Sequence, residues 1–207
     1  MRSMITRRSN LLARMLRLAG ISLALIAPAA AQPVEVTFDR AKTHIDWTLG
    51  DVLHNVQGTF ELKSGAILFD PKTGEASGQI VVDAASGNSG NGTRDGKMKK
   101  EVLETARYPD IVFAAKHVSG FVSGQETLTI QVAGNFTIHG STRDLTLTLP
   151  IVVKNTAFEA HAKFDVPYVN WGMKDPSTLF LKVDKSVQIS IAAAGVLQPA
   201  GTPQPSN

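Results

Sequence analysis

Apolar and polar side chains alternate with a period of two residues through much of this sequence. The clearest apolar phase is formed by Leu145, Leu147, Leu149, Ile151 and Val153. The same alternation runs through residues 128–132, 158–166 and 187–191. Because successive side chains of a β-strand point to opposite faces, this period predicts antiparallel sheets with one buried and one exposed face. The chain is therefore expected to be all-β.

Shorter apolar runs extend this pattern over most of the chain. They cover residues 36–38, 44–49, 59–63, 66–69, 78–83 and 111–122. Turn-forming residues separate neighbouring runs, as in DPKTG at 70–74 and HGST at 139–142. About eight to ten strands in about 165 residues are typical of a barrel or a sandwich.

One stretch departs from the period of two. Residues 86–96 are rich in Gly, Asn and Ser and predict a loop. In residues 97–106, Met98 and Val102 stand at helical spacing, so we expect one short helix there. It should end before Tyr108, which precedes a proline.

The first 31 residues have the order of an export signal. A basic segment, residues 1–17, is followed by an apolar run at 18–27 and by three alanines ending at Ala31. The apolar run of about ten residues is shorter than the roughly 20 of a spanning helix, so we expect no permanent membrane anchor. We expect cleavage after Ala31 and a periplasmic or secreted protein. The general secretory route is favoured over the twin-arginine route, because the aromatic that usually follows the arginine pair is missing after Arg7 and Arg8.

Charge and composition narrow the partners. The formal net charge is +3, but residues 1–31 hold five basic residues and no acid, which leaves 16 basic against 18 acidic residues in the remainder. Binding to nucleic acid therefore has no electrostatic basis. The predicted organisation is a signal peptide at 1–31, a β-domain at 32–197 and a disordered, proline-containing tail at 198–207.

No catalytic or metal-binding motif is present in the sequence. It contains no Cys, which excludes thiol catalysis and thiolate metal sites, and it lacks nucleophile-elbow, zincin, P-loop and dinucleotide-binding motifs. The five histidines are scattered along the chain. We therefore predict no catalytic residue, no metal and no resident cofactor.

Four segments of the sequence form a recognisable set. They are HIDW at 44–47 with His54 and VQGTF at 56–60, TRDGKM at 93–98 through YPDIVF at 108–113, VAGNFTIHGSTR at 132–143, and residues 184–195. Together they resemble the YceI-like family of exported, lipocalin-shaped lipid-binding proteins. The resemblance covers roughly residues 34–197. It implies an extended antiparallel β-barrel, lipocalin-like, whose apolar interior holds an isoprenoid or quinone-like lipid. The loop at 86–92 and the segment at 168–176, which contains a Trp, depart from the usual family pattern and bear on the identity of the lipid.

Aromatic residues in the apolar strand phase are the candidate cavity lining: Trp47, Phe60, Phe113, Phe136, Phe158, Phe164 and Trp171. Ordinary core packing is the alternative for each of them. Arg94 is the first candidate for a headgroup at the rim, because a guanidinium donates a fork of hydrogen bonds to a quinone or phosphate oxygen. The neighbouring Asp95 either orients Arg94 or caps the helix. His44 and Asn170 are further rim candidates.

Three functions stay open at this point. The first is an exported carrier, store or sequestering protein for a long-chain lipid. The second is an enzyme acting on a hydrophobic substrate in the same cavity, and the third is a solid β-sandwich that serves as an interaction module. Transient membrane contact and a homodimer that covers the barrel mouth also stay open.

Overall fold

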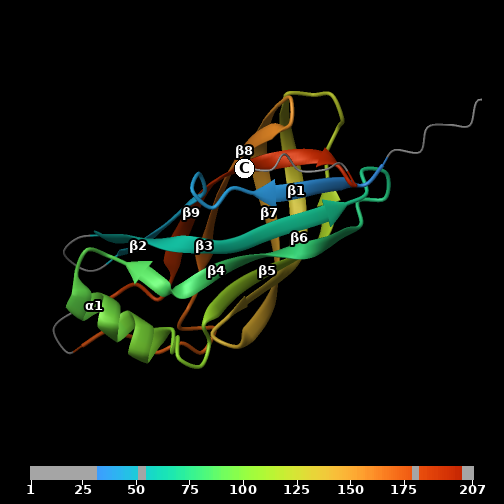
Figure 1. The fold of residues 1–207 in the computed structure, drawn as a ribbon. Coiled ribbons are helices and arrows are strands. Elements are labelled where there is room, and N and C mark those ends of the chain that lie inside the picture. The colour runs from blue at the N-terminus through green and yellow to red at the C-terminus, as the bar shows by residue number, and fades with distance from the viewer. Residues whose placement is uncertain (1–31, 51–54, 179–181, 202–207) are drawn as a thin grey trace, which may run out of the picture. The chain divides into compact units, whose positions relative to one another are not determined.

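The computed structural model describes residues 32–50, 55–178 and 182–201 (Figure 1). The predicted signal peptide lies outside these residues. The described part of the chain contains nine strands and one helical segment. The strands are β1 (Val34–Phe38), β2 (His44–Gly50), β3 (Asn55–Phe69), β4 (Ala76–Asn88), β5 (Asp110–Ser119), β6 (Thr127–Ile138), β7 (Ser141–Lys154), β8 (Ala157–Val166) and β9 (Val187–Pro199).

The strands form one antiparallel sheet that closes on itself. Its order is β1-β3-β2-β9-β8-β7-β6-β5-β4, and pairing of β3 with β4 closes the ring. β1 and β2 share one position between β3 and β9. β1 pairs with the far part of β3 and the end of β9, and β2 pairs with the first part of β3 and the middle of β9. The result is an eight-position antiparallel barrel, which confirms the predicted fold class and excludes a sandwich.

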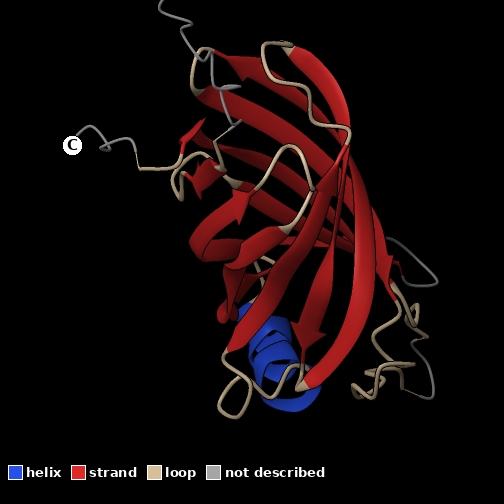
Figure 2. Ribbon diagram, turned by 90° about the vertical axis from the view of Figure 1, so that its right-hand side faces the viewer, coloured by secondary structure: helices blue, strands red, loops and turns tan. Residues whose placement is uncertain are grey.

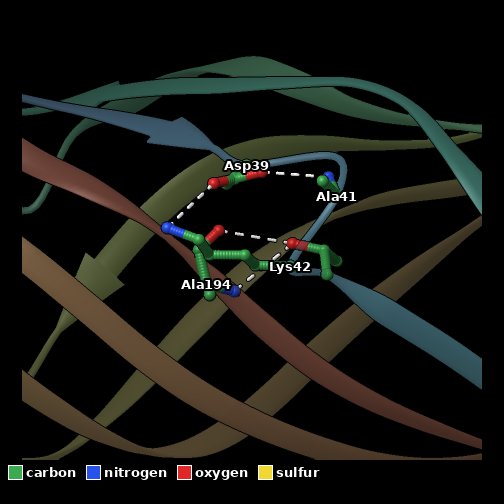
Figure 3. Close-up of polar contacts among 5 residues, drawn as sticks. Asp39, Ala41, Lys42 and Ala194 are labelled. Carbon is green, nitrogen blue, oxygen red and sulfur yellow. Dashed lines mark hydrogen bonds and ion pairs between the residues drawn. The ribbon is translucent and has the colours of Figure 1, made fainter.

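A polar corner joins β1 to β2 and fastens both to β9 (Figure 3). The backbone N–H of Asp39 donates to Ala194 O at 2.8 Å, and the Asp39 carboxylate accepts from Ala41 N–H at 2.9 Å. The Thr43 hydroxyl lies 3.3 Å from both the N and the O of Ala194. These bonds hold the two short strands in line, so that together they act as one wall of the barrel.

The single short helix is present, but its bounds differ from the predicted 97–106. α1 spans Gly92–Lys97 and continues directly into a π-helical turn, η1, at Met98–Val102. Asn91 is the N-cap, and its side-chain oxygen accepts from Arg94 N–H at 3.1 Å. Glu104, with a positive φ of 47°, follows the helical segment. The sequence pattern missed the start of α1, because its capping residue lies within the Gly- and Asn-rich residues 86–96, for which a loop is predicted.

The connections place the two ends of the barrel in different environments. At the helix end lie α1, η1, the tight β6–β7 turn and the long segment that joins β8 to β9. At the turn end lie the short β3–β4, β5–β6 and β7–β8 connections and the paired ends of β1 and β9. Figure 2 shows the helix at one end of the barrel. β9 reaches Pro199, so the first two residues of the predicted tail belong to a strand.

Candidate functional site

The barrel encloses a cavity of about 150 Å³. Its wall is built from inward-facing side chains of β1 through β9, and aliphatic and phenyl groups dominate it. Thr43 is a polar residue in this wall, and its hydroxyl is engaged with the Ala194 backbone. The cavity therefore offers apolar surface for burial and few directed polar contacts.

Four of the seven predicted lining aromatics lie in the cavity wall. They are Phe113, Phe136, Phe158 and Phe164. Phe136 meets Phe164 edge-on, with ring centroids 5.9 Å apart, and Phe158 meets Phe38 edge-on at 5.4 Å. The alternation in β5, β6 and β8 places these rings on the inner face, which is why the strand phase located them.

The other three aromatics are packed at the helix end and are not among the residues that line the cavity. The Trp47 side chain is buried, and its indole N–H has no hydrogen-bond partner among the described residues. Phe60 and Met98 both crowd Gly87, where an added Cβ would lie 2.8 Å and 2.5 Å from them. Trp171 covers Phe136, with centroids 5.9 Å apart. The strand phase is inward for Trp47 and Phe60, but their height along the barrel places them beside the helix.

The sequence reasoning passed over aliphatic residues that make up much of the wall. Leu145, Leu147 and Leu149 of β7 line the cavity, as do Ile191 and Ala193 of β9. These side chains are half-buried although they line the cavity. The alternation of β7 was the signal that could have identified its leucines as wall residues.

Arg94 is engaged on the helix rather than aimed at the cavity. Its Nε donates to Ser89 Oγ at 2.8 Å, and its Nη2 donates to Ser89 O at 3.2 Å. The buried Asp95 carboxylate accepts from Ser89 N–H at 2.9 Å and from Ser89 Oγ at 2.5 Å. Arg94 and Asp95 thus converge on Ser89 and tie the loop to α1, while Asn91 caps the helix.

His44 and Asn170 are exposed, and neither is among the residues that line the cavity. His44 stands between Thr43 and Ile45, which both face inward, so its own side chain points out from the barrel wall. Asn170 lies in the segment between β8 and β9 at the helix end. The structure does not bring Arg94, His44 and Asn170 together into one headgroup site.

The segment after β8 helps to close the helix end. Tyr168 and Met173 are buried, and the Tyr168 hydroxyl donates to Asp184 O at 2.7 Å. Lys174 on this segment forms an ion pair with Glu101 of η1 at 2.5 Å, so the segment is linked to the helix. Burial raises the pKa of Tyr168 to about 12, and the negative charges of Asp175 and Asp184 act in the same direction.

The Tyr168 contacts predict a loss of stability at alkaline pH. The ordinary pKa of a tyrosine is 10.0, so the neutral, hydrogen-bonded form contributes fully below pH 10, and this contribution is lost as the pH rises toward 12. We expect the free energy of unfolding to fall by about 2 kcal/mol across this range, and Tyr168→Phe to remove that part of the decrease. Urea unfolding at a series of pH values measures it. An identical alkaline decrease in Tyr168→Phe would contradict the assignment.

Among the described residues, no cluster of three or more His, Cys, Asp or Glu side chains is arranged to hold a metal ion. Within the same residues, no helix has both the length and the apolar character needed to cross a bilayer.

Comparison with known sequences matches most of this chain to one domain family. The model of the YceI-like domain family matches residues 36–194. A UPF0312 protein from Pseudomonas savastanoi is 29% identical over 166 residues, which is 78% of this chain and 81% of the relative. A UPF0312 protein from Vibrio parahaemolyticus is 25% identical over 138 residues, covering 64% of this chain and 71% of the relative.

Two solved structures share the fold. A polyisoprenoid binding domain from Saccharophagus degradans, implicated in plant cell wall breakdown, aligns with a TM-score of 0.61 at 14% identity, covering 78% of this chain and 98% of that domain. BcnA of Burkholderia cenocepacia aligns with a TM-score of 0.60 at 19% identity, covering 76% of this chain and 99% of its own.

Proposed function

The chain belongs to the YceI-like domain family, and from the apolar cavity in its barrel we propose that it binds a long isoprenoid or similar amphiphilic lipid. The cavity wall carries the proposal, because it combines phenyl and aliphatic side chains from all sides of the barrel. The polyisoprenoid binding domain with the same fold supports this class of ligand. Holding such a lipid away from water serves its transport, storage or sequestration.

The energetics favour a long chain. Each buried methylene contributes about 0.8 kcal/mol, whereas association costs roughly 4–15 kcal/mol. A short acyl fragment would bind barely, while about twenty buried carbons offset the cost without strong polar contacts.

The size of the cavity adds a structural requirement. Its volume is about 150 Å³, close to that of an engineered cavity that accommodates benzene. A chain of about twenty carbons needs roughly three times as much, within the range of about 300–1,000 Å³ of ordinary ligand pockets. The barrel must therefore widen or repack its inner side chains when it takes up a long lipid.

We assign the protein a non-catalytic role outside the cytoplasm. The predicted signal sequence at 1–31 favours export, and the general secretory route remains the favoured prediction. The wall supports binding over catalysis, since aliphatic and phenyl groups dominate it and His161 is the one titratable residue among its described lining, with no carboxylate beside it there. Headgroup contacts by Arg94, His44 or Asn170 stay predictions, as do transient membrane contact and a homodimer.

Analysis of the bound lipid tests the proposal. The mature protein is purified from a bacterial host without detergent, and its solvent extract is analysed by mass spectrometry. We expect a long-chain isoprenoid or amphiphilic lipid at about one molecule per chain. An extract without such a lipid, and no uptake of added long-chain isoprenoid, would overturn the proposal. Chemical conversion of added lipid by the pure protein would instead favour the enzyme.

A further inference from the structure

The ladder between β7 and β8 covers only part of the two strands. Ile151 pairs with Ala160, and the ladder ends at the turn, where Lys154 pairs with Ala157. Residues 141–150 of β7 and 161–166 of β8 have no pairing with each other in the described ladder. On their other edges the same strands pair over almost their whole lengths, β7 with β6 and β8 with β9. The two strands therefore separate toward the helix end.

The β4–β5 ladder is also short, but hydrogen bonds continue it. It pairs residues 79–83 with 110–114. Beyond one end Val118 N–H donates to Gly74 O at 2.8 Å, and beyond the other Ala84 N–H donates to Pro109 O at 2.9 Å. Between β7 and β8, the described pairing stops at Ile151 and Ala160 and is not taken up again further along the two strands.

A proline in β7 fits the point at which the β7–β8 ladder ends. Pro150 comes directly before Ile151, the last paired residue of β7. Proline has no backbone N–H to donate and is confined in sheets to edges, strand starts and bulges. Its position therefore fits the transition of β7 from a paired strand to a free edge.

The separated stretch borders the cavity directly. Leu145, Leu147 and Leu149 from β7, and Ala162 and Phe164 from β8, line the cavity on either side of it. His161 also contributes to the lining although it belongs to the outward phase of β8 and is exposed.

We propose that the lipid chain enters and leaves the cavity sideways, through an opening between residues 141–150 of β7 and 161–166 of β8. This inference rests on the proposed function and specifies its route. Aromatic side chains cover both ends of the barrel. At the helix end Trp171 packs on Phe136. At the turn end Phe69 meets Phe121 edge-on, with ring centroids 5.1 Å apart. Widening the β7–β8 opening breaks no pair of the described ladder, so the same stretch supplies the extra volume that a long chain requires.

A second possible occupant, a strand of another protein chain, fits the opening less well. Edges that avoid strand addition carry charged side chains, and the exposed positions of β8 include Glu159, His161, Lys163 and Asp165. The inner surface of the opening is apolar, which suits a hydrocarbon chain lying between the strands.

Blocking each route with a bulky adduct tests the proposal. Because the chain has no Cys, single cysteines can be introduced one at a time. Thr148→Cys and Lys163→Cys flank the opening. Ser123→Cys marks the turn end, Lys100→Cys on η1 the helix end, and Gln79→Cys a wall position on β4 whose residue pairs on both sides. All five residues are exposed, so the variants should fold. Each is labelled with biotin maleimide, and uptake of a fluorescent polyprenyl alcohol from phosphatidylcholine vesicles is followed with and without streptavidin.

We expect streptavidin to slow uptake about tenfold at Thr148→Cys and Lys163→Cys and less than about twofold at the other three positions. Slowing confined to Ser123→Cys or Lys100→Cys, or equal at all five positions, would overturn the lateral route while lipid binding stands. Absence of probe binding by the unlabelled wild-type protein at equilibrium would instead remove the proposed function, and the route with it.

Discussion

Phe136→Asp is expected to abolish stable folding of the barrel, or at least its retention of lipid. Phe136 lies in the cavity wall, is 8% exposed, and packs on Phe164 and Trp171. Loss of such a ring costs about 3–5 kcal/mol, and burying an unpaired carboxylate adds several more. The whole free energy of unfolding of a domain of this kind is about 5–15 kcal/mol. Urea unfolding followed by circular dichroism, together with lipid content, measures the effect.

Gln131→Asp is the matched control for this substitution. Gln131 lies on the same strand, β6, but is exposed on the opposite face, so the same acid there should change the free energy of unfolding by no more than about 0.5 kcal/mol. Normal unfolding and normal lipid content in Phe136→Asp would show that the phase of β6 is wrong.

Ala193→Phe is expected to abolish lipid binding while the barrel stays folded. Ala193 of β9 lines the cavity, and a phenyl ring on it would occupy a space whose volume suits benzene. Uptake of a long-chain isoprenoid should fall at least about tenfold, because the chain would have to displace a covalently attached ring. The free energy of unfolding should change by less than the roughly 1–3 kcal/mol that overpacking of a tight core costs. Fluorescence titration and urea unfolding give the two readouts.

Ser190→Phe places the same ring on the outer face of β9, where Ser190 is exposed. It should leave lipid uptake unchanged and so separates filling of the cavity from a general effect of an added aromatic. Full lipid uptake by a well-folded Ala193→Phe would show that the ligand does not use this cavity.

The strand pattern of the sequence predicted the inner face of several strands of the barrel wall. The alternation in β6 and β8 placed Phe136, Phe158 and Phe164 on one face, and the structure has all three in the cavity lining. This works because strand side chains alternate strictly, so the hydrophobic phase of an amphipathic strand names its inner face without knowledge of the neighbours.

The alternation of apolar residues could not predict at which level along the barrel axis a side chain lies. Trp47 and Ile45 share the inner face of β2, yet Ile45 lines the cavity while Trp47 is buried at the helix end. The position of the helix was also misplaced, because its capping residue, Asn91, lies in a stretch whose glycines predict a loop. For Arg94 the residue type suggested a ligand contact, whereas the fold supplied Ser89 as a nearer partner.

What the sequence determined alone is the all-β character, the inner face of the strands and the apolar nature of whatever they enclose, because these follow from local alternation. Only the tertiary structure decided that β1 and β2 share one wall position, which inner side chains border the cavity, and where β7 leaves β8. Those features depend on how the sheet closes and on the register between strands far apart in the chain, which no local pattern encodes.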